Sequence, residues 1–190
     1  MTIRENKFYI YIAIIAFLSW LMLRMTGMID TPVNHAPTHS PDYFSKDYTK
    51  WEMNEFGIPK KKVLADEMIH YSDDGTTHMK NPVMTFINAK AITPPWVVKS
   101  ETAILSSDGK DLSLNGQVVI DRIKAVGVSP LRINTSQLKV KPETNYAETV
   151  EWAELISELN ITTGIGMNLT FIDPVHIQLL AHVKGSYEKK

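Results

Sequence analysis

The chain has 190 residues, enough for one domain and an appendage, and its hydrophobic fraction of 44% is that of an ordinary folded protein. It contains no cysteine, which excludes disulfides, thiolate zinc sites, cysteine nucleophiles and a lipid-modified amino-terminal cysteine. The formal net charge of −1 gives the whole molecule no general attraction for nucleic acid.

Residues 1–29 predict a short cytoplasmic tip followed by a transmembrane anchor. Arg4 and Lys7 precede an apolar run from Phe8 to Leu23, which becomes long enough to cross a bilayer when it continues through the next few residues. A cleaved signal peptide would begin in the same way, but no Ala-x-Ala-like site follows the run; a buried core helix is the remaining alternative. Because positive charge precedes the run, we expect the amino terminus in the cytoplasm and the rest of the chain outside.

Residues 30–43 predict a linker, and residues 44–190 predict the folded domain. The linker holds three prolines among short polar residues, a composition that favours an extended, semi-rigid spacer. His35 and His39 lie four residues apart, a spacing that suits a metal ion only on a helix. Since the prolines exclude a helix, we interpret both histidines as part of a solvated linker.

One pattern occurs twice in the first half of the domain, in residues 64–86 and 98–120. Each copy is centred on an Asp-Gly pair, at 74–75 and at 108–109, and the copies align on these pairs without a gap. Asp-Gly between alternating apolar runs is a strong hairpin signal, because glycine adopts the positive φ that the turn needs. Pro82 in the first copy indicates an edge position or a bulge, since proline cannot donate to a sheet.

The later segments also predict strands. The apolar residues of 131–140 change parity midway, which predicts a bend or bulge. Residues 148–160 combine helix-forming and strand-forming residues, and we expect a strand there because of the surrounding pattern. Gly164 and Gly166 interrupt the next strand and indicate a bulge or a close backbone approach. Residues 175–183 alternate between apolar and mostly polar side chains, as a half-buried strand does.

The sequence contains no recognisable catalytic constellation. There is no nucleophile elbow, no phosphate-binding glycine-rich loop and no zinc-binding His-Glu-x-x-His helix. Asp73, Asp74 and Asp108 could be imagined as paired acids or calcium ligands, but they stand in predicted turns where aspartate is favoured for backbone reasons. We therefore predict no catalytic residues, no metal and no cofactor, and that the protein is not an enzyme.

The chain resembles the LptC family, the inner-membrane, single-pass component of the lipopolysaccharide export bridge of Gram-negative bacteria. Besides the anchor, the resemblance is carried by the segments 71–75, 106–120, 164–167 and 182–188. It implies an all-β domain, a twisted open β-jellyroll of stacked antiparallel hairpins in the periplasm, preceded by one transmembrane helix. The LptA type of bridge protein shares the repeated hairpin but lacks the anchor.

The resemblance also implies the partners. The protein would receive lipopolysaccharide from an inner-membrane ABC transporter, with LptF/LptG-like permease subunits and a separate ATPase. It would pass the lipid to a periplasmic LptA-like protein of the same fold, for assembly in the outer membrane, and would catalyse no reaction itself.

Two sets of residues are expected to carry this function. Strand parity and the repeat predict an inward, lipid-binding groove lined by Val63, Ile69, Tyr71, Met84, Phe86, Val97, Ala103, Leu105, Val118, Ile120, Ile177 and Leu179. The last strand predicts a partner-binding edge that includes Val175, Ile177, Leu180, Val183 and Tyr187.

Two other functions are considered beside this one. The first is a membrane-tethered scaffold that binds proteins through its edge strands and carries no lipid. The second is a carbohydrate-active enzyme built on stacked hairpins. That enzyme would need two carboxylates about 5–5.5 Å or 6.5–9.5 Å apart across one cleft, and no pair in the sequence stands out for this role.

Overall fold

A computed structural model describes residues 3–25, 39–87, 94–158, 160–171 and 175–187. The chain divides into two compact units, Met1–Pro37 and Thr38–Lys190. Residues 26–38, which hold most of the predicted linker and His35, lie outside the described residues.

The described residues of the first unit form the helix α1 (Ile3–Met25). Its segment Lys7–Met25 is long and apolar enough to cross a membrane, and none of its residues is buried within the structure. Large apolar side chains point outward on every side of this segment, as they do in a helix surrounded by lipid rather than by protein.

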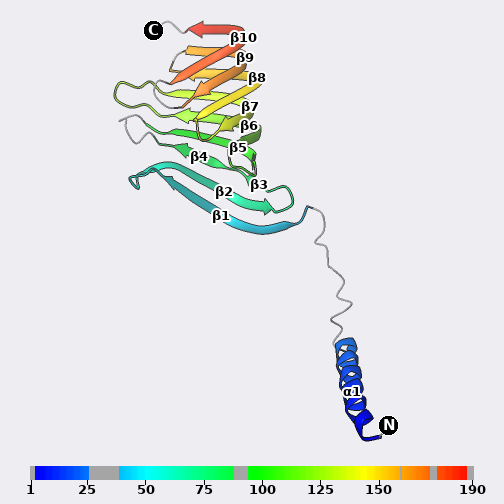
Figure 1. The fold of residues 1–190 in the computed structure, drawn as a ribbon. Coiled ribbons are helices and arrows are strands. Elements are labelled where there is room, and N and C mark those ends of the chain that lie inside the picture. Colours follow the sequence, from blue (N-terminus) through cyan, green and yellow to red (C-terminus); the bar gives the residue numbers. More distant parts are fainter. Residues whose placement is uncertain (1–2, 26–38, 88–93, 159, 172–174, 188–190) are drawn as a thin grey trace. The chain divides into compact units, whose positions relative to one another are not determined.

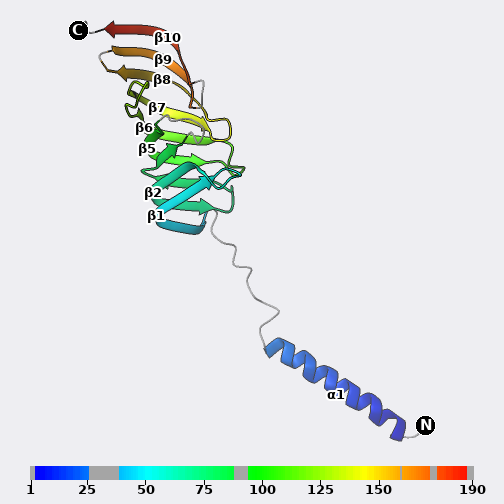
Figure 2. The same ribbon diagram turned by 90° about the vertical axis from the view of Figure 1, so that its left-hand side faces the viewer.

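The second unit is a ten-stranded antiparallel sheet in which neighbours in sequence are mostly neighbours in space (Figure 1). Figure 2 shows the same stack from the side, with the strand direction changing along it, as the twist of a sheet requires. Its strands are β1 (Pro41–Met53), β2 (Pro59–Tyr71), β3 (Thr77–Lys80), β4 (Val83–Phe86), β5 (Trp96–Leu105), β6 (Leu112–Arg122), β7 (Leu131–Lys141), β8 (Tyr146–Ser157), β9 (Asn160–Thr170) and β10 (His176–Tyr187).

Both predicted Asp-Gly hairpins are confirmed, since β2 pairs with β3 and β5 pairs with β6. Gly75 and Gly109 adopt φ of 69° and 71° in these turns. β3 and β4 form one interrupted rung, because each pairs with β2 on one side and β5 on the other. Pro82 is fully buried at the interruption, so it marks a bulge inside the sheet and not an edge. The expected strand over residues 148–160 is confirmed as far as Ser157, the end of β8. Glu158 lies in a turn, residue 159 is outside the described residues, and Asn160 begins β9.

A row of bends crosses the sheet and changes which residue parity faces inward. In β7 the buried side chains before Gln137 are Ile133 and Thr135, and those after it are Leu138 and Val140. Gln137 has a positive φ of 49°, which confirms the predicted bend in this strand. Positive φ values occur on six rungs of the described sheet, at Asp47, Asn81, Gly116, Gln137, Gly166 and His182.

The bends allow the sheet to close over one apolar core. The ring of Phe86 in β4 stacks on that of Phe171, just after β9, with centroids 4.7 Å apart, and Trp96 meets Phe171 edge to face at 5.8 Å. Since β4 and β9 are not neighbours in the stack, these contacts join the two ends of the interior. The architecture is therefore the predicted jellyroll, with its core on the concave face.

Candidate functional site: an inner groove and two sheet edges

The inner face contains a cavity of about 380 Å³, which we call the inner groove. It is lined by residues of β1 to β6 and by the turns that follow β2, β5 and β7. This volume is within the range of small-molecule sites, roughly 300–1,000 Å³. Its apolar lining is Tyr48, Val63, Met68, Met79, Met84, Phe86, Leu105 and Leu112.

Most of the residues predicted to face inward do so. Five of them are buried in the core, namely Met84, Phe86, Ala103, Val118 and Ile120. Four more are partly buried and pack against the core, namely Val63, Leu105, Ile177 and Leu179. Among these nine, the ones that line the inner groove itself are Val63, Met84, Phe86 and Leu105.

The prediction is wrong for Ile69, Tyr71 and Val97, which lie on the outer face. In β2 the buried positions change from Ala65 to Met68, so the strand bends between them and its later odd-numbered residues turn outward. Ile69 and Tyr71 line a shallow outer depression instead. A sequence-based assignment that carries one parity through the whole strand cannot include this bend.

The assignment of Val97 to the inner face is wrong because the Asp-Gly pair occupies a different position in each of the two turns. Backbone hydrogen bonds close the first turn over residues 71–76 and the second over residues 106–111. The Asp-Gly pair therefore stands one residue later in the first turn than in the second. Aligning the copies on these pairs equated Val63 with Val97, whereas the buried counterpart in β5 is Val98.

One end of the inner groove is charged, a feature that the sequence analysis missed. Lys50 and Glu52 of β1 and Lys61 of β2 line the groove there. The Lys61 side chain is only 12% exposed, and its Nζ donates to the carbonyl oxygen of Pro142. Burial lowers the pKa of Lys61 below its ordinary value of 10.5. The only sequence signal was the lysine run after Pro59, which is ordinarily a solvated feature.

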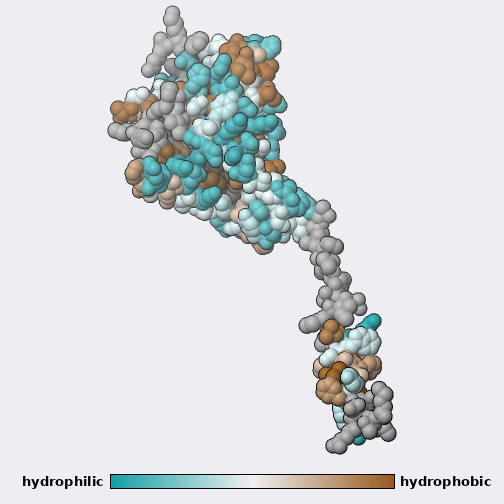
Figure 3. Space-filling model, viewed as in Figure 1, coloured by the Kyte–Doolittle hydropathy of each residue, from teal (hydrophilic) through white to brown (hydrophobic). Residues whose placement is uncertain are grey.

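Two strands of the described sheet have a neighbour on one side only, β1 beside β2 and β10 beside β9. In β10, Ile177 and Leu179 pack inward, while Leu180 and Val183 are exposed at 53% and 56%. Figure 3 shows apolar side chains on the surface at the β8–β10 end of the stack. The alternation predicted over this strand is interrupted near His182, where the β9–β10 register shifts.

The other predicted edge residues lie at the two ends of β10. Val175 immediately precedes the strand and packs partly against the core. Tyr187 ends the strand, and its backbone pairs with Asn160 of β9. Along β1, at the opposite edge, large side chains are exposed at Tyr43, Phe44, Trp51 and Met53.

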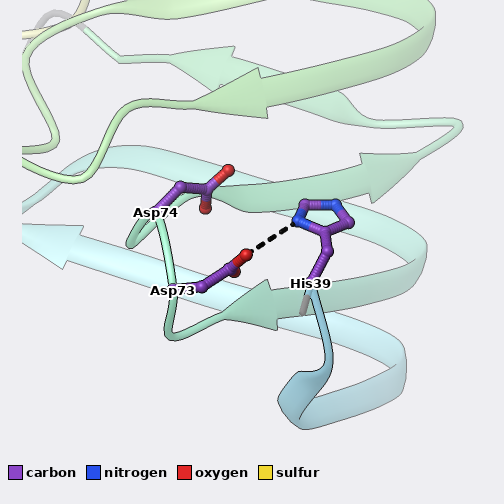
Figure 4. A group of neighbouring side chains, drawn as sticks. All are labelled: His39, Asp73 and Asp74. Atoms are coloured by element: carbon purple, nitrogen blue, oxygen red, sulfur yellow. Dashed lines mark hydrogen bonds and ion pairs between the residues drawn. The ribbon is translucent and has the colours of Figure 1, made fainter. Parts of the chain in front are cut away.

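His39 lies just before β1 and contacts the β2–β3 turn (Figure 4). Its Nδ1 is 3.2 Å from Asp73 Oδ2, and its ring stacks on Tyr71 with centroids 4.1 Å apart. The interpretation of His39 as merely solvated is therefore incomplete. His39, Asp73 and Asp74 place possible metal ligands within 4.8 Å of one another, but all three are exposed. We assign the group a structural role, holding the start of β1 to the neighbouring turn.

Comparison with known proteins gives a family and a fold. The family model "Lipopolysaccharide-assembly, LptC-related" matches residues 8–188. The chain is 24% identical over 186 residues to the lipopolysaccharide export system protein LptC of Escherichia coli (strain K12), covering 97% of this chain and 95% of that one, and the same values hold for LptC of Shigella flexneri.

A solved structure with a similar fold is LptH of Pseudomonas aeruginosa, described as the LptA-homologous periplasmic component of the conserved lipopolysaccharide transport device. The TM-score is 0.52 with 12% sequence identity, and the match covers 68% of this chain and 95% of that chain. At this identity the likeness shows the fold alone.

Proposed function

The chain belongs to the LptC-related lipopolysaccharide-assembly family, and from this premise we propose that it is a membrane-anchored bridge protein that binds and passes on lipopolysaccharide. It takes the lipid from an inner-membrane ABC transporter and delivers it to a periplasmic partner of the same fold. The observation that carries the proposal is the inner groove, an apolar cavity in a jellyroll whose fold is that of a periplasmic transport component.

Acyl chains suit this groove because its walls are mainly apolar and formed by flexible or branched side chains such as Met68, Met84 and Val63. Contacts of this kind are non-directional, and their strength follows the apolar area removed from water. The protein can therefore hold chains of varied length without one decisive hydrogen bond. Release to the next protein then requires a continuous apolar path and no chemical step, so we propose no catalytic role.

The anchor sets the topology in this proposal. Helix α1 crosses the inner membrane once, with Arg4 and Lys7 on the cytoplasmic side. The jellyroll then lies in the periplasm, tethered through residues 26–38. Retention of the helix keeps the groove close to the transporter that loads it, and the LptF/LptG-like permease subunits with their ATPase are the proposed source of lipid.

The sheet edges provide the proposed protein contacts. We assign β10 to the periplasmic LptA-like partner, because β-augmentation there would extend one sheet and one apolar interior across both proteins. The other edge strand, β1, would then be available to pair with a second jellyroll domain on the transporter side. Main-chain hydrogen bonds would supply much of each junction, with the exposed apolar residues of β10 adding buried area.

Equilibrium lipid binding tests the proposal against the scaffold alternative. The purified full chain in detergent, loaded with a fluorescent apolar probe, should release the probe when lipopolysaccharide is added, and the release should saturate. Deoxycholate at the same concentration serves as the amphiphile control. Capture of the periplasmic partner without any saturable lipid binding would support the scaffold and overturn the proposed function.

A further inference from the structure

Three ammonium groups gather at the end of the inner groove where β1 turns into β2. Lys60 Nζ lies 2.5 Å from Glu52 Oε1, and Lys61 Nζ lies 3.9 Å from the same oxygen. Lys50 lies beside them on β1, opposite Val63, and forms no ion pair among the described residues. Glu143 is the second carboxylate whose charge acts on Lys61. Three cations thus stand beside two anions. Lys62, which also lines the groove, places its ammonium over the Trp51 ring, so the end of the groove is positive.

The pairing around Lys61 is incomplete for a buried charge. Removing an ammonium from water is costly unless close anions and hydrogen bonds replace its hydration. The Pro142 carbonyl supplies one acceptor, but the Glu52 carboxylate is much closer to Lys60 than to Lys61. Burial accordingly lowers the pKa of Lys61 in spite of its neighbours' negative charge. An added anion at this point would compensate the buried charge.

We propose that Lys50 and Lys61 form a subsite for a phosphate group of the lipid whose acyl chains occupy the inner groove. This inference rests on the proposed function and specifies which part of the ligand lies where. Lipopolysaccharide carries phosphates on the sugars that bear its acyl chains, so one molecule presents both chemistries over a short distance. Lys50 and Lys61 line the same cavity as Val63, Met84 and Phe86, and therefore match that pattern.

The phosphate would add charge-assisted hydrogen bonds, which are shorter and stronger than neutral ones. Lys61 is largely buried and held by Pro142, so it offers a preorganised donor. Lys50 is exposed and has no ion pair among the residues that the structure describes, so it can turn toward the ligand at little cost. Glu52 remains paired with Lys60. The subsite would also fix the direction in which the lipid enters the groove.

The test measures binding of three probes to the purified full chain, namely bisphosphorylated lipid A, dephosphorylated lipid A with the same acyl chains, and inorganic phosphate. The variants are Lys50→Met, Lys61→Met and the double variant, with Lys46→Met as the control. Lys46 stands on β1 opposite Glu67 and does not line the groove. Methionine preserves most of the length and packing of the lysine side chain.

The wild type and Lys46→Met should prefer phosphorylated lipid by about tenfold, and the preference should shrink at high salt. The double variant should lose the preference while binding dephosphorylated lipid as before. Equal binding of the two lipids by the wild type would refute the subsite. The subsite is also refuted if Lys61→Met and the double variant keep the preference for phosphorylated lipid while Lys61→Met lowers stability, because Lys61 then has only a structural role. Saturable binding of inorganic phosphate alone, without a lipid preference, would likewise refute a headgroup site. Failure of the wild type to bind either lipid would instead refute the proposed function.

Discussion

The rings of Phe86 and Phe171 stack almost parallel, with an interplanar angle of 6° and centroids 4.7 Å apart. Phe86 ends β4, near one edge of the sheet, and Phe171 follows β9, near the other. Both are buried, at 6% and 3% exposure. The stack closes the interior between the two halves of the jellyroll, and Phe86 also lines the inner groove.

Loss of this stack should weaken the whole domain. Phe171→Ala should lower the free energy of unfolding by about 3–5 kcal/mol, because a large buried ring is removed and a cavity remains. A double-mutant cycle with Phe86→Leu should show a coupling of roughly 0.5–1.5 kcal/mol. Urea unfolding followed by fluorescence measures both. Phe44→Ala, at a 69% exposed position, should change stability by less than about 0.5 kcal/mol, and an equal loss there would contradict the assignment.

Two turn glycines provide a matched pair. Gly75 and Gly109 have nearly the same positive φ, so alanine at either should cost about 1–2 kcal/mol of backbone strain. A Cβ at Gly75 would lie 2.7 Å from Ser107 Cβ in the neighbouring turn, whereas a Cβ at Gly109 would meet nothing within 4 Å. Gly75→Ala should therefore destabilise the domain by a further 1–3 kcal/mol or so, the usual range for overpacking. Identical unfolding midpoints for the two variants would show that the turns do not touch.

Local sequence signals predicted the elements well, because each depends on neighbouring residues. The Asp-Gly hairpins and the apolar helix appear in the structure, and so does the alternation of the last strand as far as Leu180. A bend was predictable where the apolar residues change from one parity to the other along a strand, as they do on either side of Gln137. In β2 no such signal exists, since Ile69 and Met68 are both apolar and either could face the core. Only the pairing of β2 with β3 decides that Met68 is buried.

The charged end of the groove was beyond local reasoning for a different cause. Lys61 is buried where its ammonium donates to the carbonyl oxygen of Pro142. This residue is distant in sequence and is brought beside β2 by closure of the jellyroll. His39 is similar, because its contact with Asp73 depends on how β1 lies against β2. Both features arise from tertiary contacts. In the sequence alone, Lys61 belongs to an ordinary lysine run and His39 to a linker.

An acidic titration tests the contact that fixes the start of β1. His70 Nδ1 lies 2.7 Å from Asp42 Oδ1, and this hydrogen bond lowers the pKa of Asp42 below its ordinary value of 3.8. The contribution of Asp42 to stability is thus present above about pH 3.8 and is lost as the pH falls through the lowered pKa. NMR titration should show this pKa rising in His70→Gln and unchanged in His78→Gln. An unaltered Asp42 pKa in His70→Gln would contradict the contact.

Truncation tests the edge assigned to the periplasmic partner. Deletion of residues 183–190 removes the part of β10 that pairs with residues 160–163 of β9. Capture of an LptA-like partner should fall to background, while lipid binding persists because the inner groove lies at the other end of the stack. Leu180→Ala should have little effect, since main-chain hydrogen bonds dominate such junctions. Full capture by a folded truncated protein would move the docking edge to β1.

Site-specific photo-crosslinking can show whether lipid travels along the inner face of the jellyroll. A photoreactive residue is placed at Val63 or Leu105 on the inner face, or at Ile69 or Val97 on the outer face, in membranes reconstituted with the transporter and lipopolysaccharide. We expect lipid crosslinks that increase with ATP at the two inner positions, and only background at the two outer ones. Equal crosslinking on both faces, or none at the inner positions under ATP turnover, would show that lipid does not follow the inner face.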